Sequence, residues 1–209
     1  MKIVIFGATG TVGQNLIEQA LMRGHEITAF TRNPEKLTET SGKLTVLMGD
    51  VLNPSAVTDA VKNQDAVICA LGMPLMNKEG LRAAGTKNIV AAMNDTGVKR
   101  LICLSALGIG DSRSILPFYY KFLIVPLFMR HLFADHTAQE TIVTNSKLNW
   151  TIVRPGNFTK GSITGTYQIE DGRGNKQLKL KISPKDVAGF MLKQLDTDQF
   201  LKMRPSISY

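Results

Sequence analysis

Apolar residues in the first part of the chain alternate between short unbroken runs and segments where they recur every three or four residues. The first run is 3–6 (IVIF). A helix-like spacing follows it, carried by Leu16, Ile17, Ala20 and Leu21. The run is typical of a strand buried on both faces of a parallel sheet, and the spacing is that of one helix face. Together they predict a strand, a turn and a helix that ends at Gly24.

The same alternation continues along most of the chain. Further strands are expected at 25–31, 44–48, 65–71, 98–104 and 148–153, and further helices at 54–61, 80–94, 133–145 and 185–195. This pattern predicts an α/β fold built on a doubly wound parallel sheet. The length of 209 residues fits one domain over 1–209, with a small C-terminal substrate lobe and substrate-side elements mainly at 105–182.

Two later stretches break the alternation. Residues 165–169 and 177–182 flank the turn-rich run 170–174 and are expected to pair as a hairpin, and 202–209 is expected to add a final edge strand.

Residues 115–133 hold too many apolar side chains for a solvated helix. We expect part of this segment in the core and part lining a wide apolar pocket suited to a flat aromatic ligand, with a dimer interface as the alternative.

Composition and charge limit what the protein can bind. Hydrophobic residues make up 44% of the chain and charged residues 20%, which is ordinary for a globular protein. The net charge is +8, but no run of five basic residues occurs. The densest basic patch, Lys176, Lys179 and Lys181, alternates as on one face of a strand. We therefore expect a solvated basic face that attracts phosphorylated ligands, and no nucleic-acid partner.

Neither a targeting segment nor a membrane span is expected. The first residues form a strand and a glycine turn, without the apolar region and small-residue cleavage site of a signal peptide. The most apolar later stretch, 115–129, is too short to cross a bilayer and contains Pro117, Lys121 and Pro126. We therefore expect a soluble, cytoplasmic protein with no membrane partner.

Three glycines follow the first strand at intervals of three, in the sequence GATGTVG. Gly7, Gly10 and Gly13 lie between a buried strand and a helix, which is the context in which such a motif binds a nucleotide. Glycines let the backbone approach a pyrophosphate, and the free N–H groups at the start of the helix point at it. The sequence thus predicts a nucleotide site. A plain strand-to-helix turn is the alternative, and it does not need three glycines.

The end of the second strand indicates which nicotinamide nucleotide binds. Units specific for NAD place an Asp or Glu here for a ribose hydroxyl, whereas this chain has Thr31-Arg32-Asn33, with Lys36 just beyond. A guanidinium can bind a 2′-phosphate that a carboxylate would repel. Arg32 therefore predicts NADP(H), and an exposed loop arginine is the alternative.

Residues at the carboxyl ends of the other strands are candidates for the rim of the site. Asp50 is placed either to meet an adenine amino group or to form a turn, and Gly72 follows the fourth strand. Ser105 follows the fifth strand and either binds substrate or caps the turn. His136 is the best titratable candidate, with a plain helix-surface histidine as the alternative.

Some familiar catalytic patterns are absent from the sequence. The usual short-chain dehydrogenases use a Tyr-x-x-x-Lys pair as general acid, and none of the four tyrosines has a lysine four residues later. The three histidines form no metal-binding pattern. Cys69 and Cys103 lie in apolar strand-like runs, where buried, inert thiols are expected. Without the Tyr–Lys pair, alcohol–ketone chemistry of the usual kind lacks its general acid.

Taken together, the motifs resemble the biliverdin-IXβ reductase/flavin reductase group of atypical short-chain dehydrogenase/reductases, which have NAD(P)H-binding, NmrA-like Rossmann domains. The resemblance covers essentially the whole chain. It is carried by GATGTVG, Thr31-Arg32, GDV at 49–51, ALG at 70–72, SALG at 105–108, Asp135-His136, RPG at 154–156, and TGTYQIEDGRG at 164–174 followed by SPKDVAGFML. The chain departs from the group at Asn157, where the mammalian reductase has a histidine, and at 112–133, which is more apolar.

The resemblance implies a monomer or weak homodimer that transfers a hydride from NADPH to a flavin (FMN or riboflavin), a quinone or a linear tetrapyrrole. The flavin would be a substrate rather than a tightly bound cofactor, and no metal is implied. Catalytic roles would fall on Ser105 and His136. Cofactor binding would fall on Gly7, Thr9, Gly10, Thr11, Val12, Gly13, Arg32, Asp50, Val51, Leu71, Gly72, Ser105 and Pro155.

Two other functions are alternatives to this one. An NmrA-like regulator that binds NADP(H) without turnover and signals to a protein partner would have the same glycine motif. Turnover of NADPH with added FMN would separate the two. A sugar-nucleotide epimerase or dehydratase is disfavoured, because the chain is short and lacks both a large C-terminal substrate domain and the Tyr–Lys pair.

Overall fold

The computed structural model describes residues 1–72, 80–171 and 178–209. Its main sheet has eight strands in the order β3-β2-β1-β4-β5-β6-β10-β8. Their bounds are β1 (Lys2–Phe6), β2 (Glu26–Thr31), β3 (Leu44–Met48), β4 (Ala66–Cys69), β5 (Arg100–Leu104), β6 (Asn149–Pro155), β8 (Gln168–Glu170) and β10 (Ser206–Ser208). Neighbouring strands run parallel, except that β8 is antiparallel to β10. The predicted doubly wound, mostly parallel sheet is therefore confirmed.

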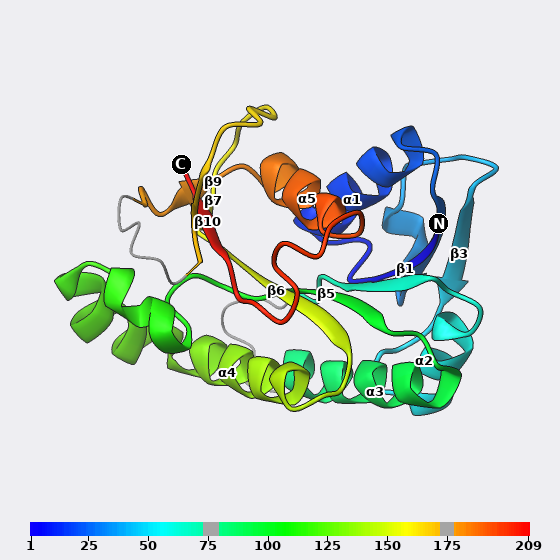
Figure 1. The fold of residues 1–209 in the computed structure, drawn as a ribbon, viewed down its shortest axis with the longest axis horizontal. Helices are drawn as coiled ribbons and strands as arrows, with labels where there is room; N and C mark the ends of the chain where they lie inside the picture. Colours follow the sequence, from blue (N-terminus) through cyan, green and yellow to red (C-terminus); the bar gives the residue numbers. More distant parts are fainter. Residues whose placement is uncertain (73–79, 172–177) are drawn as a thin grey trace.

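Helices cover both faces of this sheet. They are α1 (Thr11–Met22), α2 (Pro54–Val61), α3 (Leu81–Thr96), α4 (Arg130–Thr144) and α5 (Pro184–Lys193). Helices α1 and α5 pack together on one face, and α2, α3 and α4 lie side by side on the other (Figure 1). Crossovers between parallel strands place helices on both faces, so the central strands have no solvated side.

The side chains of β1 show how one strand contributes to two cores. Ile3 and Ile5 pack in the cluster that includes residues of α1 and α5, and Val4 and Phe6 pack in the cluster that includes residues of α2 and α3. All four side chains are fully buried. The unbroken apolar run is thus confirmed as a strand buried on both faces, because such a strand has no position for a polar side chain.

Three helix ends carry residues that typically cap helices. The Asn53 side chain accepts hydrogen bonds from two backbone N–H groups in the first turn of α2. The Ser183 hydroxyl accepts one from the N–H of Asp186 in the first turn of α5. Gly97 ends α3 in the left-handed conformation, with φ of 81°. The Asn53 and Ser183 side chains thus satisfy N–H groups that have no partner within the helix, and the left-handed conformation of Gly97 lets the chain leave α3.

The expectation of a hairpin around residue 170 is wrong. Strand β8 pairs with β10, while β9 (Lys181–Ile182) pairs in parallel with β7 (Asn157–Phe158), so the two expected arms do not pair with each other. The tail does form a strand, but β10 lies between β6 and β8 rather than at an edge. Its central residue Ile207 is fully buried there. The hydrophobic burial of this residue favours the long-range pairing over a local hairpin.

The basic strand face expected at Lys176, Lys179 and Lys181 is also not what the described residues form. Lys176 lies outside them. Lys179 precedes β9, and Lys181 is the first of the two residues of that strand. The alternation of these lysines therefore does not correspond to one face of a long strand.

Residues 110–129 form two helical segments that project beyond the end of the sheet, at the left of Figure 1. They are the 3-10 helix η2 (Gly110–Ile115) and the π-helix η3 (Tyr120–Met129). Pro126 lies inside η3 and lacks the N–H group that an α-helical hydrogen bond would require. None of the helices among the described residues has the length and apolarity to cross a bilayer.

Part of 115–133 is buried, as expected, but most of its large apolar side chains are not. Leu116 and Val125 are buried. Six others are exposed to solvent: Phe118, Tyr119, Phe122, Leu123, Leu127 and Phe128. The segment extends past the sheet, and within 1–72, 80–171 and 178–209 no second layer covers its outer side.

Candidate functional site

Two of the three motif glycines are required by the packing of the chain itself. Gly7 has a φ of 82°, and a Cβ there would lie 2.2 Å from the carbonyl oxygen of Ala70. A Cβ at Gly13 would lie 2.1 Å from the carbonyl oxygen of Gly7, so α1 packs directly against the turn. Only glycine permits both approaches. A plain strand-to-helix turn thus accounts for these two glycines and leaves the third unexplained.

Gly10 is the motif glycine that the fold requires least. Its φ of −74° is open to any residue. A Cβ there would meet one neighbouring atom, the carbonyl oxygen of Gly7 at 3.2 Å. Gly10 directly precedes α1, whose first turn has neither a side-chain cap nor an acidic residue. The first N–H groups of α1 are therefore available to an anion, and the bare glycine leaves room for it, so a pyrophosphate fits this turn.

Two cavities meet at the same turn. One has a volume of about 450 Å³ and the other about 250 Å³, and Gly10, Leu71 and Gly72 line both. They lie at the carboxyl ends of β1 and β4, which are neighbours in the sheet although they are not consecutive in the chain. Ligands of doubly wound sheets bind where the strand order reverses in this way. A dinucleotide that crosses the turn would place one half in each cavity.

The smaller cavity holds most of the residues expected at the adenosine end. It is lined by Gly7, Thr9, Gly10, Phe30, Thr31, Arg32, Asn33, Lys36, Gly49, Val51, Leu71, Gly72 and Leu81. The Arg32 side chain is 60% exposed, and its Nη1 lies 3.8 Å from Oδ2 of Asp50. The guanidinium is therefore held loosely and can turn toward a phosphate.

Asp50 does not itself belong to the described lining of either cavity. Its Oδ1 accepts a hydrogen bond from the backbone N–H of Leu52, at 2.9 Å. The turn role is therefore confirmed for Asp50. Its contact with adenine stays a prediction.

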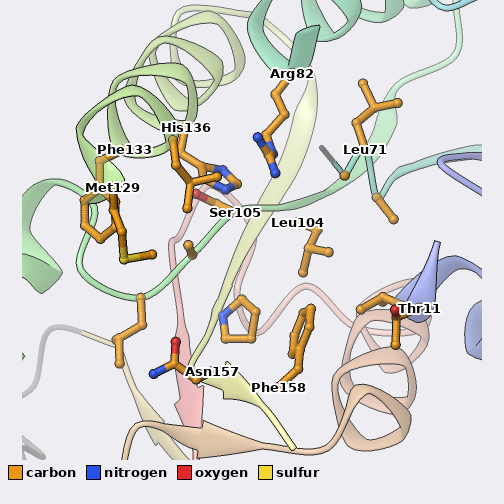
Figure 2. A pocket seen from close by; sticks show the side chains of 18 of the residues that line it. Thr11, Leu71, Arg82, Leu104, Ser105, Met129, Phe133, His136, Asn157 and Phe158 are labelled. Carbon is orange, nitrogen blue, oxygen red and sulfur yellow. The ribbon is translucent and has the colours of Figure 1, made fainter. Parts of the chain in front are cut away.

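The larger cavity lies between the strand ends and the projecting segment, as Figure 2 shows from close by. Its wall is mostly apolar and includes Leu104, Leu116, Tyr120, Met129 and Phe133. The expectation that part of 115–133 lines a pocket is thus confirmed. Of the predicted site residues, this cavity is lined by Gly10, Thr11, Val12, Leu71, Gly72, Ser105, His136 and Pro155.

Ser105 is buried at the end of β5, where it lines the larger cavity. Its hydroxyl donates a hydrogen bond to Oε1 of Glu140 at 2.6 Å, so the side chain is directed to α4 rather than to a turn. Glu140 also accepts hydrogen bonds from Nε and Nη2 of Arg154, at 2.8 and 2.6 Å. Because its proton is committed to Glu140, the Ser105 hydroxyl can only accept a hydrogen bond from a ligand.

Arg154 is the centre of a buried polar network that the sequence analysis missed. It lies on β6, is 1% exposed, and also pairs with Asp111 of η2 at 2.7 Å. Burial opposes its charge, but the hydrogen bonds and charges of Glu140 and Asp111 raise the pKa of Arg154. The RPG motif could have drawn attention to Arg154, because it puts an arginine at the end of an apolar strand. The network connects β6, α4 and the loop after β5, and so fixes the position of Ser105.

His136 is 5% exposed and lines the larger cavity, so the interpretation as a helix-surface histidine is wrong. Its Nδ1 lies 3.2 Å from Oε1 of Gln139, whose Nε2 donates a hydrogen bond to the Thr86 hydroxyl. Because Oε1 is an acceptor, Nδ1 carries the proton of the neutral ring, and Nε2 can accept a hydrogen bond. Figure 2 shows the ring directed into the cavity, near Ser105 and Arg82.

We expect His136 to lower the stability of the protein as the pH falls below neutral. Its pKa is lowered from 6.5 to about 4, first because burial disfavours the charged ring and also because Arg82 repels it. Between these two values the unfolded chain binds a proton that the folded chain does not, so stability is lost as the pH drops from 6.5 toward 4. Urea unfolding should show a free energy of unfolding lower by about 2 kcal/mol at pH 5 than at pH 7.

The matched variants for this measurement lie on the same helix. His136→Asn should lose most of the pH dependence, whereas His131→Asn, at an exposed position of α4, should retain it. The same dependence in both variants would show that another group is responsible.

Arg82 is a second residue that no sequence motif marked. It lies in the first turn of α3, is buried, and lines the larger cavity. Its Nη1 lies 3.4 Å from Oδ2 of Asp135, and Asp135 also accepts hydrogen bonds from the backbone N–H groups of Arg82 and Ala83. Its Nε is buried and has no hydrogen-bond partner among the described residues. A ligand with an acceptor atom would satisfy this donor, whose isolation otherwise costs free energy.

The two cysteines are buried free thiols, as predicted, and are direct neighbours across β4 and β5. Within 1–72, 80–171 and 178–209, no three His, Cys, Asp or Glu residues are grouped so that they could hold a metal ion.

Comparison with known proteins identifies one protein family. A family described as NAD(P)H-binding matches residues 7–198. An uncharacterised chloroplast protein of Arabidopsis thaliana is 30% identical over 179 residues, which cover 81% of this chain and 63% of that protein. The chain thus spans less than two thirds of this relative. The cytoplasmic location expected from the sequence stays a prediction.

Two solved structures illustrate the shared fold. A short-chain dehydrogenase/reductase of Veillonella parvula in complex with NADP is 20% identical, with a TM-score of 0.83, and the match covers 100% of this chain and 94% of that one. ChuY, an anaerobilin reductase of Escherichia coli, is 22% identical, with a TM-score of 0.81 and coverage of 100% and 97%. At these identities the likeness shows the fold.

Proposed function

The chain belongs to the NAD(P)H-binding family, and from this premise we propose that it is an NADPH-dependent oxidoreductase that reduces a flat conjugated acceptor. The acceptor would be a flavin such as FMN or riboflavin, or a linear tetrapyrrole or quinone. The observation that carries the proposal is the apolar cavity of about 450 Å³ that opens at the same turn as the nucleotide site. A cavity of this size suits a planar ring system of low polarity.

The nucleotide would be held by backbone groups at its centre and by cations at one end. The N–H groups of Thr11 and Val12 would bind the pyrophosphate, since they open α1 and line the larger cavity. Arg32 and Lys36, which line the smaller cavity, would bind the 2′-phosphate. When bound, NADPH supplies a hydride to the acceptor.

Three polar side chains would orient the acceptor against the apolar wall. The buried Nε of Arg82 offers a hydrogen-bond donor, and its charge would favour electron density arriving on the acceptor. Ser105 and Nε2 of His136 offer acceptors. Because the pKa of His136 is about 4, the ring is neutral at physiological pH, and solvent would supply the proton to the reduced acceptor.

A direct assay tests the proposal. Oxidation of NADPH by the purified protein would be followed by absorbance with FMN, riboflavin, a quinone and biliverdin in parallel, and with NADH as the alternative donor. We expect turnover with at least one of these acceptors and a preference for NADPH. Tight binding of NADPH without turnover on any acceptor would contradict an enzymatic function and favour a sensor that responds to the nucleotide.

Replacing Arg32 by Glu is expected to remove the preference for NADPH. A charge-assisted hydrogen bond contributes about 1.5–3 kcal/mol, so its loss should weaken NADPH binding by roughly ten- to a hundredfold and change NADH binding little. The ratio of the two dissociation constants, measured by titration, reports the effect. Arg23→Glu makes the same charge change at an exposed position outside both cavities and should leave the ratio unaltered. An unaltered ratio in Arg32→Glu would exclude the assigned role.

A further inference from the structure

Three pairs of exposed apolar residues lie on the outer side of η3 and of the helical turn that directly precedes it. The pairs are Phe118 and Tyr119, Phe122 and Leu123, and Leu127 and Phe128. Their exposed fractions range from 53% to 78%, so all six side chains face solvent. We call this set the apolar stripe.

The conformation of η3 explains why the three pairs form one stripe. Successive pairs are separated by four or five residues, which is more than one turn of an α-helix. In a π-helix the hydrogen bonds run from residue i to i+5, so a turn holds more residues and positions four to five apart lie above one another. Phe118, in the helical turn just before η3, packs against Phe122, with 4.7 Å between the two ring centres, so the first pair continues the stripe.

The inner side of the same segment is also apolar, and it forms part of the wall of the larger cavity. Tyr120 and Met129 line the larger cavity together with Leu116 and Phe133. A helix that is apolar on all sides is normally buried, and an exposed apolar patch of this kind usually marks an interaction surface. The outer side of η3 therefore requires a partner that the chain itself does not provide among the described residues.

Charge distinguishes between the possible partners. Residues 112–134 contain Arg113, Lys121 and Arg130 and no Asp or Glu. Within the described part of the chain, none of these three cations forms an ion pair with a carboxylate. The net charge of the whole chain is +8. A second copy of the chain would bring its own cations to the same face, whereas an anionic lipid surface would attract all three.

We propose that the apolar stripe docks the protein on the surface of an anionic lipid bilayer. Phenylalanine, tyrosine and leucine side chains would enter the boundary between head groups and acyl chains, and the neighbouring cations would contact lipid phosphates. This is peripheral binding, consistent with the absence of a bilayer-spanning helix among the described residues. It revises the sequence-based expectation of no membrane partner, and it goes beyond the proposed enzymatic function without depending on it.

Vesicle co-sedimentation tests the proposal. The full chain should bind vesicles of phosphatidylcholine and phosphatidylglycerol in a molar ratio of about 2:1, bind phosphatidylcholine alone much less, and lose binding at high salt. The double variant Phe122→Ser, Phe128→Ser should weaken the partition coefficient by at least about tenfold, because two large apolar side chains no longer leave water. The matched control Met22→Ser, Met48→Ser removes two equally exposed apolar side chains elsewhere and should bind as the original chain does.

A labelled variant gives a second readout that does not depend on removing the stripe. The native cysteines are buried, so an environment-sensitive fluorophore can be attached to Phe122→Cys alone. Its emission should shift to the blue when the mixed vesicles are added, whereas a label on Met22→Cys should not respond. Failure of the original chain to bind the mixed vesicles would overturn the proposal. A dimer in solution that Phe122→Ser, Phe128→Ser converts to a monomer would also overturn it, because the stripe would then be an interface between copies.

The same variants separate this proposal from the proposed function. Neither Phe122 nor Phe128 lines either cavity in the described residues. NADPH oxidation with water-soluble FMN should therefore proceed equally fast in the stripe variant and in the original chain. Loss of vesicle binding at unchanged turnover identifies a docking defect, and vesicle binding can be scored even if no acceptor is turned over.

Discussion

Replacing Glu140 by Gln is expected to destabilise the protein by about 3–5 kcal/mol, because it leaves the Arg154 guanidinium buried without its principal counter-charge. Glu140 bonds that guanidinium twice, at 2.6 and 2.8 Å, and Arg154 is 1% exposed. Its remaining partner Asp111 is 66% exposed and can compensate only in part. A loss of this size is a large fraction of the 5–15 kcal/mol that typically separates folded and unfolded states. Chemical unfolding at neutral pH measures it.

Two comparisons identify the buried charge as the cause. Glu18→Gln makes the same substitution at an exposed position of α1 and should change the free energy of unfolding by less than about 0.5 kcal/mol. The double variant Glu140→Leu, Arg154→Met removes both charges and should recover most of the stability that the single variant loses, since an apolar pair of similar volume costs little. Equal stability of Glu140→Gln and Glu18→Gln would mean that the ion pair does not form in solution.

Replacing Gly10 by Val is expected to weaken NADPH binding by at least about a hundredfold, roughly 2.8 kcal/mol, while the protein stays folded. The conformation at Gly10 is open to any residue, and the single neighbour of a new Cβ is a carbonyl oxygen at 3.2 Å. The side chain would instead occupy the space that both cavities share in front of α1. Backbone approach to the pyrophosphate would then be blocked.

The control for this variant is another glycine that the fold leaves open. A Cβ at Gly42 would have no neighbour within 4 Å, and Gly42 lines neither of the two cavities at the turn. Gly42→Val should therefore bind NADPH normally, as measured by titration calorimetry, and both variants should unfold near the temperature of the original chain. Normal binding by Gly10→Val would exclude this turn as the pyrophosphate site.

Features that depend on neighbouring residues could be predicted from the sequence. The strand 44–48 and the helix 54–61 have the bounds that the apolar pattern indicated. Helix caps are equally local, because the side chain of Asn53 or Ser183 acts on N–H groups two or three residues away. The rim residues could be anticipated for the related reason that parallel strands end at one edge of the sheet.

Features that depend on distant partners could not be predicted in this way. Arg154 at the end of an apolar strand gives no indication that Glu140, from a different element, lies against it. The unpartnered Nε of Arg82 likewise follows from three-dimensional packing and not from a motif. The pairing of 168–170 with 206–208 depends on burying Ile207 within the sheet, which the local alternation cannot express.

The apolar character of 115–133 was recognised from the sequence, but the exposure of its outer side chains was not foreseen. Hydrophobic residues are usually inside, so a dense apolar segment predicts a core. Here the inner side chains line a cavity, and the outer ones face solvent because no other described part of the fold lies beyond them. Hydrophobicity alone does not distinguish a core from a surface that awaits a partner.

Strand β10 lies between β6 and β8, and this position affects the order in which the strands can pair during folding. Strands β1, β2 and β4 come from the first third of the sequence and can associate while synthesis continues, whereas the free edge of β6 must wait for residues 206–208. Strands that are distant along the chain pair slowly. Until they pair, an exposed apolar strand edge can bind other chains. We therefore expect β1, β2 and β4 to associate early on the ribosome. We expect the nascent chain to depend on chaperones during the later period, until residues 206–208 pair with β6.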